Sequence, residues 1–240
     1  MVWIVVAIAA ALGLLCTRQT GAPNGAWEMV SSLLWLGLFA SCATSMNNYV
    51  SMLIIVEAMS LALLLLLAST TSLTADASTR AAEALELLFW VSALSTLSLV
   101  AGIVTMALAG HPLGTTAVTA SRGLHHNIGA TCGSLLMAFG LSVKVGFPPF
   151  GGWLVRFYNS ATPTTLVVYI AGYYPLMLVT VIAVLGFLRA GPLAAAAPIL
   201  AFTSALAVLS VAALVQDAHT ARTVLAASSL TSAALIQLAV

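Results

Sequence analysis

The chain has 240 residues, of which 62% are hydrophobic and 5% are charged, and its mean hydropathy is +1.13. Soluble domains carry about 25% charged residues, so this composition excludes a soluble globular protein. The formal net charge of +1 excludes a basic surface for nucleic acid. Three widely separated cysteines form no CxxC pair, and the sequence contains no phosphate-binding loop, nucleophile elbow or zinc motif. We therefore predict an integral membrane protein that holds no metal or cofactor of its own.

Eight apolar segments approach or reach the length of a membrane-spanning helix, which is about 20 residues. They are rich in Leu, Ala and Val on every side and do not alternate, which favours helices over barrel strands. We predict an all-α, polytopic membrane helix bundle that forms one transmembrane domain over residues 1–240. The first segment lacks a basic N-terminal region, so we do not expect a cleaved targeting segment. The predicted spans are residues 2–16, 27–44, 49–68, 82–109, 128–158, 165–188, 198–214 and 223–240.

The third and fifth predicted spans each carry an ionisable residue in their interior, Glu57 and Lys144. If Arg156 marks a membrane interface, Lys144 lies about 18 Å deeper along a continuous helix. Such a group at the centre of a membrane helix costs about 2.5–3.5 kcal/mol, so two of them indicate an ion or proton pathway. The alternative is that Glu57 and Lys144 only pair and fix helix packing. A pair whose protonation changes satisfies both interpretations.

The sequence after Lys144 predicts a break in the fifth span. Pro148 and Pro149 lack the N–H groups that would bond the carbonyls of Lys144 and Val145. Freed carbonyls at membrane depth are tolerated where protein or water satisfies them, and broken helices form ion sites in many transporters. A plain packing kink is the alternative, but a proline four residues after a buried lysine favours a functional break.

The sixth span contains a second predicted distortion, at Pro175, whose missing N–H would free the carbonyl of Ala171. The hydroxyls of Tyr173 and Tyr174, directly before this proline, are candidates for a proton relay. Tyrosines also gather at membrane interfaces, and packing there is the more frequent explanation for such a pair.

The segment Lys144–Trp153 reads K-x-G-x-x-P-F-x-x-W. This pattern resembles the signature of subunit 2 of the proton-pumping NADH:quinone oxidoreductase (respiratory complex I), an antiporter-like membrane subunit. The sister antiporter-like subunits share a similar motif. The resemblance covers about residues 49–232. Three further stretches resemble family features in the same order, namely Glu57, residues 78–84, and residues 222–229 with their A-x-S-S turn.

The resemblance implies a non-redox, membrane-arm subunit that contributes to proton translocation coupled to electron transfer from NADH to quinone. It implies that Glu57 is a modulating carboxylate and that Lys144 is the lysine that takes up and passes on a proton. Ser228 and Ser229 join the tyrosine pair as candidate relay groups. NADH, FMN, iron–sulfur clusters and quinone are expected in partner subunits. The expected partners of this chain are other membrane-arm subunits and membrane lipids.

Two departures from the family pattern leave alternatives open. The family has a further buried lysine at about Gly172 or Tyr173, and this chain has none there. The proton then passes through water or the tyrosines, or the path is lost. We expect first spans over residues 1–45 and an antiporter-like core over residues 46–240. Family members continue beyond the position of Val240, so we expect this core to be incomplete at its C-terminus. A separate chain is one expected source of the missing half.

Two rival functions remain at this point. One is a structural subunit of the same complex with a degenerate proton channel. The other is a component of a Mrp-type cation/proton antiporter. A shortened, lysine-poor form favours the mitochondrial inner membrane over a bacterial plasma membrane as its location.

Overall fold

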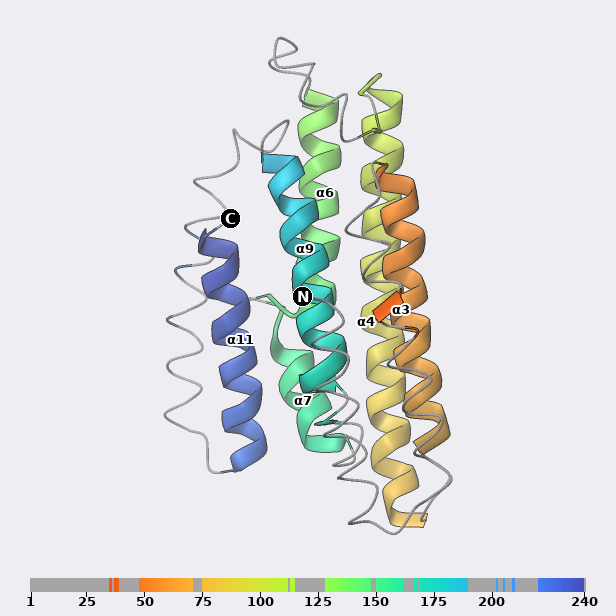
Figure 1. The fold of residues 1–240 in the computed structure, drawn as a ribbon, viewed down its shortest axis with the longest axis vertical. Helices are drawn as coiled ribbons and strands as arrows, with labels where there is room; N and C mark the ends of the chain where they lie inside the picture. Colours follow the sequence, from red (N-terminus) through yellow and green to blue (C-terminus); the bar gives the residue numbers. More distant parts are fainter. Residues whose placement is uncertain are drawn as a thin grey trace.

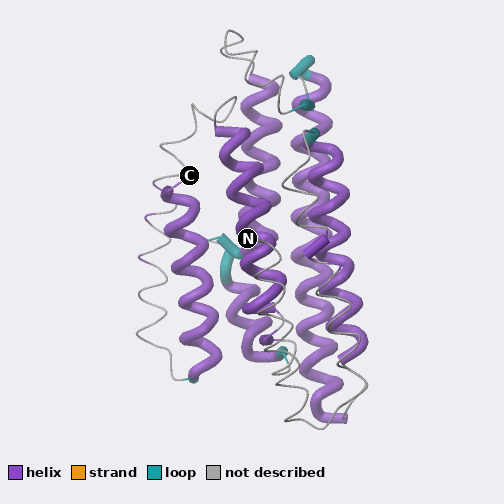
Figure 2. The backbone as a smooth tube through the Cα atoms, viewed as in Figure 1, coloured by secondary structure: helices purple, strands orange, loops and turns teal. Residues whose placement is uncertain are grey.

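The computed structural model describes about three fifths of the chain, and all regular structure in that part is helical. The described helices run side by side along the long axis of the molecule (Figure 1; Figure 2). The predicted spans 2–16, 27–44 and 198–214 lie outside the described residues, apart from isolated positions. The described residues are 35, 37–38, 48–70, 75–111, 113–114, 128–147, 150–161, 166–167, 169–189, 202, 205, 209 and 220–239.

The other five predicted spans are found as helices, and the prediction of a helical membrane bundle is confirmed. Span 128–158 is divided into two helices, and the helix predicted to start at residue 82 starts at Ala75. The elements are α3 (Tyr49–Thr70), α4 (Ala75–Leu108), α6 (Ile128–Val145), α7 (Gly152–Ser160), the π-helical turn η2 (Tyr169–Tyr173), α9 (Tyr174–Arg189) and α11 (Ala221–Ala239).

Length and composition mark two of these helices as able to cross a membrane. Within the described ranges they are Ala82–Leu108 and Ile128–Val145, and Tyr49–Leu65 and Tyr169–Ile182 are shorter apolar stretches. The outward face of α4 carries large apolar side chains such as Trp90, which is 63% exposed. An apolar outer face of this kind suits lipid or a neighbouring subunit rather than water.

The closest helix contact in the described part joins α4 to α6, which pack more extensively than any other pair. Gly133 and Gly140 are seven residues apart and therefore lie on one face of α6. A Cβ atom on Gly133 would lie 2.7 Å from the carbonyl oxygen of Gly102, and one on Gly140 would lie 2.9 Å from that of Ser95. The Ser95 hydroxyl donates a hydrogen bond of 2.8 Å to the Gly140 carbonyl. Small residues thus bring the two backbones together, as in other membrane helix pairs.

The α4–α6 contact predicts that Gly140→Ala destabilises the bundle. The new methyl group would overlap the backbone of α4, and overpacking of this kind costs about 1–3 kcal/mol. Gly152→Ala is the matched control, because a Cβ atom there meets no other atom within 4 Å. Thermal unfolding of the purified assembly in mild detergent should show a lower midpoint for Gly140→Ala only. Equal midpoints for the two variants would contradict the packing described above.

Candidate functional site

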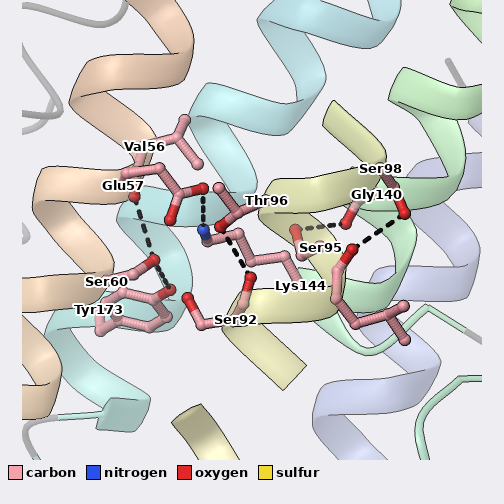
Figure 3. Close-up of polar contacts among 11 residues, drawn as sticks. Val56, Glu57, Ser60, Ser92, Ser95, Thr96, Ser98, Gly140, Lys144 and Tyr173 are labelled. Carbon is pink, nitrogen blue, oxygen red and sulfur yellow. Dashed lines mark hydrogen bonds and ion pairs between the residues drawn. The ribbon is translucent and has the colours of Figure 1, made fainter. Parts of the chain in front are cut away.

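Lys144 on α6 and Glu57 on α3 form an ion pair inside the bundle (Figure 3). The distance from Lys144 Nζ to Glu57 Oε1 is 2.5 Å. Lys144 is 3% exposed and is the only buried charged residue in the described part of the chain. The Glu57 side chain keeps 22% of its surface exposed. The lysine is therefore enclosed by protein, whereas the carboxylate is reachable from one side.

The end of α6 places Lys144 in the last helical turn. Gly146 has a φ of +75°, which a glycine adopts without steric cost. The N–H of Phe147 donates to the Ser142 carbonyl at 2.8 Å, and the N–H of Gly146 donates to the Val143 carbonyl at 3.2 Å. These two bonds and the left-handed glycine form a Schellman motif. A cation is favoured at this end of a helix, because the backbone dipoles make it partly negative.

The predicted break after Lys144 is confirmed, and Gly146 forms the turn that ends the helix. The helix ends at Val145, before Pro148 and Pro149, which lie outside the described residues. The depth estimate from Arg156 followed one helix, whereas Lys144 and Arg156 lie on two helices, α6 and α7. The break itself lies about midway along the long axis of the bundle (Figure 2). Lys144 is therefore held at the middle of the molecule by a helix end.

Trp153 on α7 bonds back to the last turn of α6. Its indole Nε1–H donates to the Val143 carbonyl at 3.0 Å, and its side chain is almost buried. The Val143 carbonyl also accepts the N–H of Gly146, so the indole bond uses its second lone pair and ties α7 to the last turn of α6. Gly146 and Trp153 belong to the sequence pattern that begins at Lys144, which by itself predicted no role for either residue. The structure shows that both shape the break.

Tyr173 lies close to the ion pair, as Figure 3 shows. Its hydroxyl and the Ser60 hydroxyl are 3.3 Å apart, and the Ser60 hydroxyl also donates to the Val56 carbonyl at 3.1 Å. Ser60 is one helical turn from Glu57 on α3, so both side chains face the same neighbours. Sequence analysis missed Ser60, because a serine in an apolar span gives no signal of its partner.

A helical distortion lies directly before Pro175. The turn Tyr169–Tyr173 is π-helical, and α9 begins at Tyr174, one residue before the proline. A π-helical turn holds more residues than an α-helical one, so it accommodates the missing N–H of proline and rotates the residues before it. Tyr173 and Tyr174 are adjacent on the helix and therefore point to different parts of the bundle.

Tyr174 and Ser229 meet at a second polar contact, on α11. The Tyr174 hydroxyl donates to the Ser229 carbonyl at 2.6 Å, and the hydroxyls of Tyr158 and Ser229 are 2.7 Å apart. Ser228 is exposed and does not face this contact. The structure therefore separates the predicted relay residues into two groups, with Tyr173 beside the ion pair and Tyr174 beside Ser229.

A cluster of aromatic rings joins these two groups. The ring of Tyr169 stacks on that of Tyr173, with centroids 5.4 Å apart. The same ring lies 5.9 Å from those of Tyr158 and Tyr174. Tyr169 is fully buried, and its hydroxyl has no hydrogen-bond partner among the described residues. Tyr169 thus lies between the ion-pair side and the α11 side of the bundle.

Arg222 at the start of α11 forms hydrogen bonds with the C-terminal end of α7. Its Nη1 donates to the carbonyls of Asn159 at 2.9 Å and Ala161 at 3.1 Å, at the C-terminal end of α7. Free carbonyls at a helix end bind cationic side chains well.

We found no group of three or more His, Cys, Asp or Glu residues that would hold a metal ion within the described ranges.

The comparison with protein families matches residues 46–240 to the family described as "NADH:quinone oxidoreductase/Mrp antiporter, TM". The chain belongs to this family. The resemblance inferred from Glu57 and the motif after Lys144 is thereby confirmed at the level of an antiporter-like membrane subunit. A comparison with curated proteins gave no match.

Two solved structures have the same fold. One is the respiratory complex I from Thermus thermophilus with bound aureothin, with a TM-score of 0.75 and 24% sequence identity over 99% of this chain and 50% of that chain. The other is the membrane-bound sulfane sulfur reductase, an archaeal respiratory membrane complex, with a TM-score of 0.79 and 18% identity over 98% of this chain and 47% of that chain. The chain spans about half the length of these two chains.

The ion pair predicts a strong energetic coupling between Glu57 and Lys144. Glu57→Leu leaves a buried ammonium without a partner, which costs about 3–5 kcal/mol. Adding Lys144→Met should recover most of that loss, because an apolar pair replaces a buried ion pair at little or no cost. Thermal unfolding of the two single variants and the double variant measures the coupling. Additive losses in the double variant would show that the two residues do not interact.

The Schellman motif predicts that Gly146→Ala affects both stability and function. An alanine in the left-handed region costs about 1–2 kcal/mol, and relief of that strain would shift the last turn that carries Lys144. Gly110→Ala is the matched control, because Gly110 has a φ of +70° and lies outside the site. Both variants should unfold earlier by similar amounts, but only Gly146→Ala should lower proton-linked turnover. Equal turnover in the two variants would argue against a role for the break.

Proposed function

We propose that this chain is a proton-translocating, membrane-arm subunit of a respiratory complex, and that Lys144 is the group that takes up and releases the proton. The observation that carries the proposal is the ion pair between the buried Lys144 and the partly exposed Glu57, located at a helix break. Intramembrane charges are rare and mark ion or proton pathways more often than structural sites. Membership of the antiporter family supports the same function.

The chemistry follows from the charge balance at the pair. A nearby carboxylate favours the protonated ammonium form of a buried lysine, and burial alone favours the neutral amine. Movement of Glu57 toward Lys144 would therefore load the lysine with a proton, and movement away would release it. Glu57 is reachable from outside the bundle, so a neighbouring subunit is able to pull on the carboxylate. The chain itself requires no redox group for this work.

The wider setting is also part of the proposal. We propose that the chain acts as subunit 2 of complex I in a mitochondrial inner membrane, beside other membrane-arm subunits. Electron transfer from NADH to quinone, with FMN and iron–sulfur clusters, would then take place in partner subunits. The motif after Lys144 supports subunit 2, and the scarcity of lysine in the chain supports a divergent mitochondrial form. The family also includes Mrp antiporters, so the test below has to separate the two functions.

Lys144→Met is the variant that tests this function. Methionine keeps the length of the side chain but cannot carry a proton, so we expect normal assembly with proton transport reduced by about tenfold or more. Arg156→Met is the control, because Arg156 is an exposed basic residue on α7. The measurements are NADH-driven quinone reduction and proton uptake in membrane vesicles.

Each alternative function has its own outcome in that experiment. Unchanged turnover and proton stoichiometry in Lys144→Met would assign the chain a structural role with a degenerate channel. Cation-dependent proton exchange without any quinone reduction would assign it to a Mrp-type antiporter. A loss of proton transport that is confined to Lys144→Met, with Arg156→Met like the wild type, would support the proposal.

A further inference from the structure

An apolar cavity lies between the four helices α3, α4, α6 and α9. Its volume is about 20 Å³, and its wall includes Val56 on α3, Leu141 on α6 and Val184 on α9. None of these three side chains is more than 3% exposed, so the cavity belongs to the interior of the bundle. Val56 directly precedes Glu57 (Figure 3), and Leu141 lies one helical turn before Lys144. The cavity therefore begins about one turn from the ion pair.

The chemistry of the wall predicts that this cavity is dry. By volume it has room for a water molecule, which needs about 10–15 Å³. A buried water also needs two to four polar partners, and the wall consists of aliphatic and methionine side chains apart from Tyr49. The Tyr49 hydroxyl is buried and has no hydrogen-bond partner among the described residues. One hydroxyl does not hold a water in such a place, whereas xenon and other small apolar molecules bind in dry cavities.

The packing of α3 around this cavity is uneven. Within the described part of the chain, α3 packs mainly against α4, and its backbone makes little contact with α6. By contrast, the close glycine contact joins α4 and α6 firmly. At the start of α3, the N–H of Tyr49 donates to the Leu113 carbonyl at 3.1 Å, and Glu57 lies about two turns further along the helix. The helix that carries Glu57 is thus held at its beginning and loosely packed on α6.

We propose that this dry cavity is the free volume that α3 uses when Glu57 moves away from Lys144, and that a small apolar molecule bound in it holds the ion pair closed. The proposal rests on the proposed function, which requires these two residues to move apart. A close-packed interior resists such a shift, because the side chains along the contact have to find new neighbours. Empty volume next to the pair makes the shift easier. A void also costs stability, since its lining atoms lose contacts, and folds accept such a cost at functional sites.

Two cavity-filling variants of the complete assembly test this inference. Val184→Ile and Val56→Ile each add one methylene group to the wall, from α9 and from α3. Val181→Ile is the matched control, because it makes the same change one turn away on α9, at a buried position that does not line the cavity. The measurements are the thermal unfolding midpoint and the rate of NADH-driven proton transport in vesicles at equal assembly.

We expect both cavity variants to unfold about 2 °C later than the wild type, because the added group gains contacts where atoms are missing. Their proton transport should be about threefold slower or more, since α3 has less room to shift. Val181→Ile should keep the wild-type rate and should not unfold later, because that part of the core has no space to fill. Earlier unfolding of both cavity variants, wild-type transport in both, or equal slowing in Val181→Ile would overturn the inference.

Xenon gas is the probe for the ligand. Vesicles of the wild type under xenon pressure should transport protons more slowly and recover when the gas is removed, and Val184→Ile should respond at most half as strongly. A high-resolution cryo-EM map of the wild type should show no water beside the Tyr49 hydroxyl. Equal xenon effects on the two proteins, or an ordered water in the cavity, would contradict the inference.

The Lys144→Met variant separates this inference from the proposed function. If Lys144→Met transports protons like the wild type, the proposed function itself fails. If Lys144→Met loses transport while both cavity variants keep the wild-type rate, the function stands and the role of the cavity does not.

Discussion

The ammonium group of Lys144 lies in the protein interior, where an unpaired charge costs several kcal/mol. The described structure compensates this charge in two ways. The carboxylate of Glu57 lies 2.5 Å away, and the carbonyls at the C-terminal end of α6 provide a partly negative environment. Both require that α6 end where it does and that α3 lie opposite its last turn. The other contacts of the site depend on these two conditions.

The helix break and the close α4–α6 contact together meet those conditions. Gly146 ends α6 directly after the turn that holds Lys144, and Trp153 bonds the returning helix to that turn. Gly140, one turn earlier, lets α4 approach α6 so that Ser95 reaches its carbonyl. Ser92 on α4 then borders a small cavity beside Lys144. Gly140 in α6 thus allows α4 to place Ser92 near Lys144. Glu57 on α3 neutralises the charge of that lysine.

The two solved structures that share this fold belong to complexes with different names and chemistry, a respiratory complex I and a sulfane sulfur reductase. A membrane bundle of this fold is therefore present in both complexes. In this chain the proposed proton transfer rests on the ion pair between Lys144 and Glu57. An event in a neighbouring subunit would act on such a pair through electrostatics or helix movement.

The sequence by itself determined the helical membrane class, the five spans that the structure describes, the break after Lys144 and the two ionisable residues inside apolar spans. It did so because the bilayer restricts both backbone and charge, so apolar length and an isolated charge carry information without any neighbours. Only the tertiary structure decided that Glu57 meets Lys144, 87 residues away, and that Tyr173 meets Ser60, 113 residues away. It also placed Tyr173 beside Ser60 and Tyr174 beside Ser229, because the partner of each depends on which helix packs against it. Apolar spans look alike in sequence, so which helices become neighbours is settled by packing.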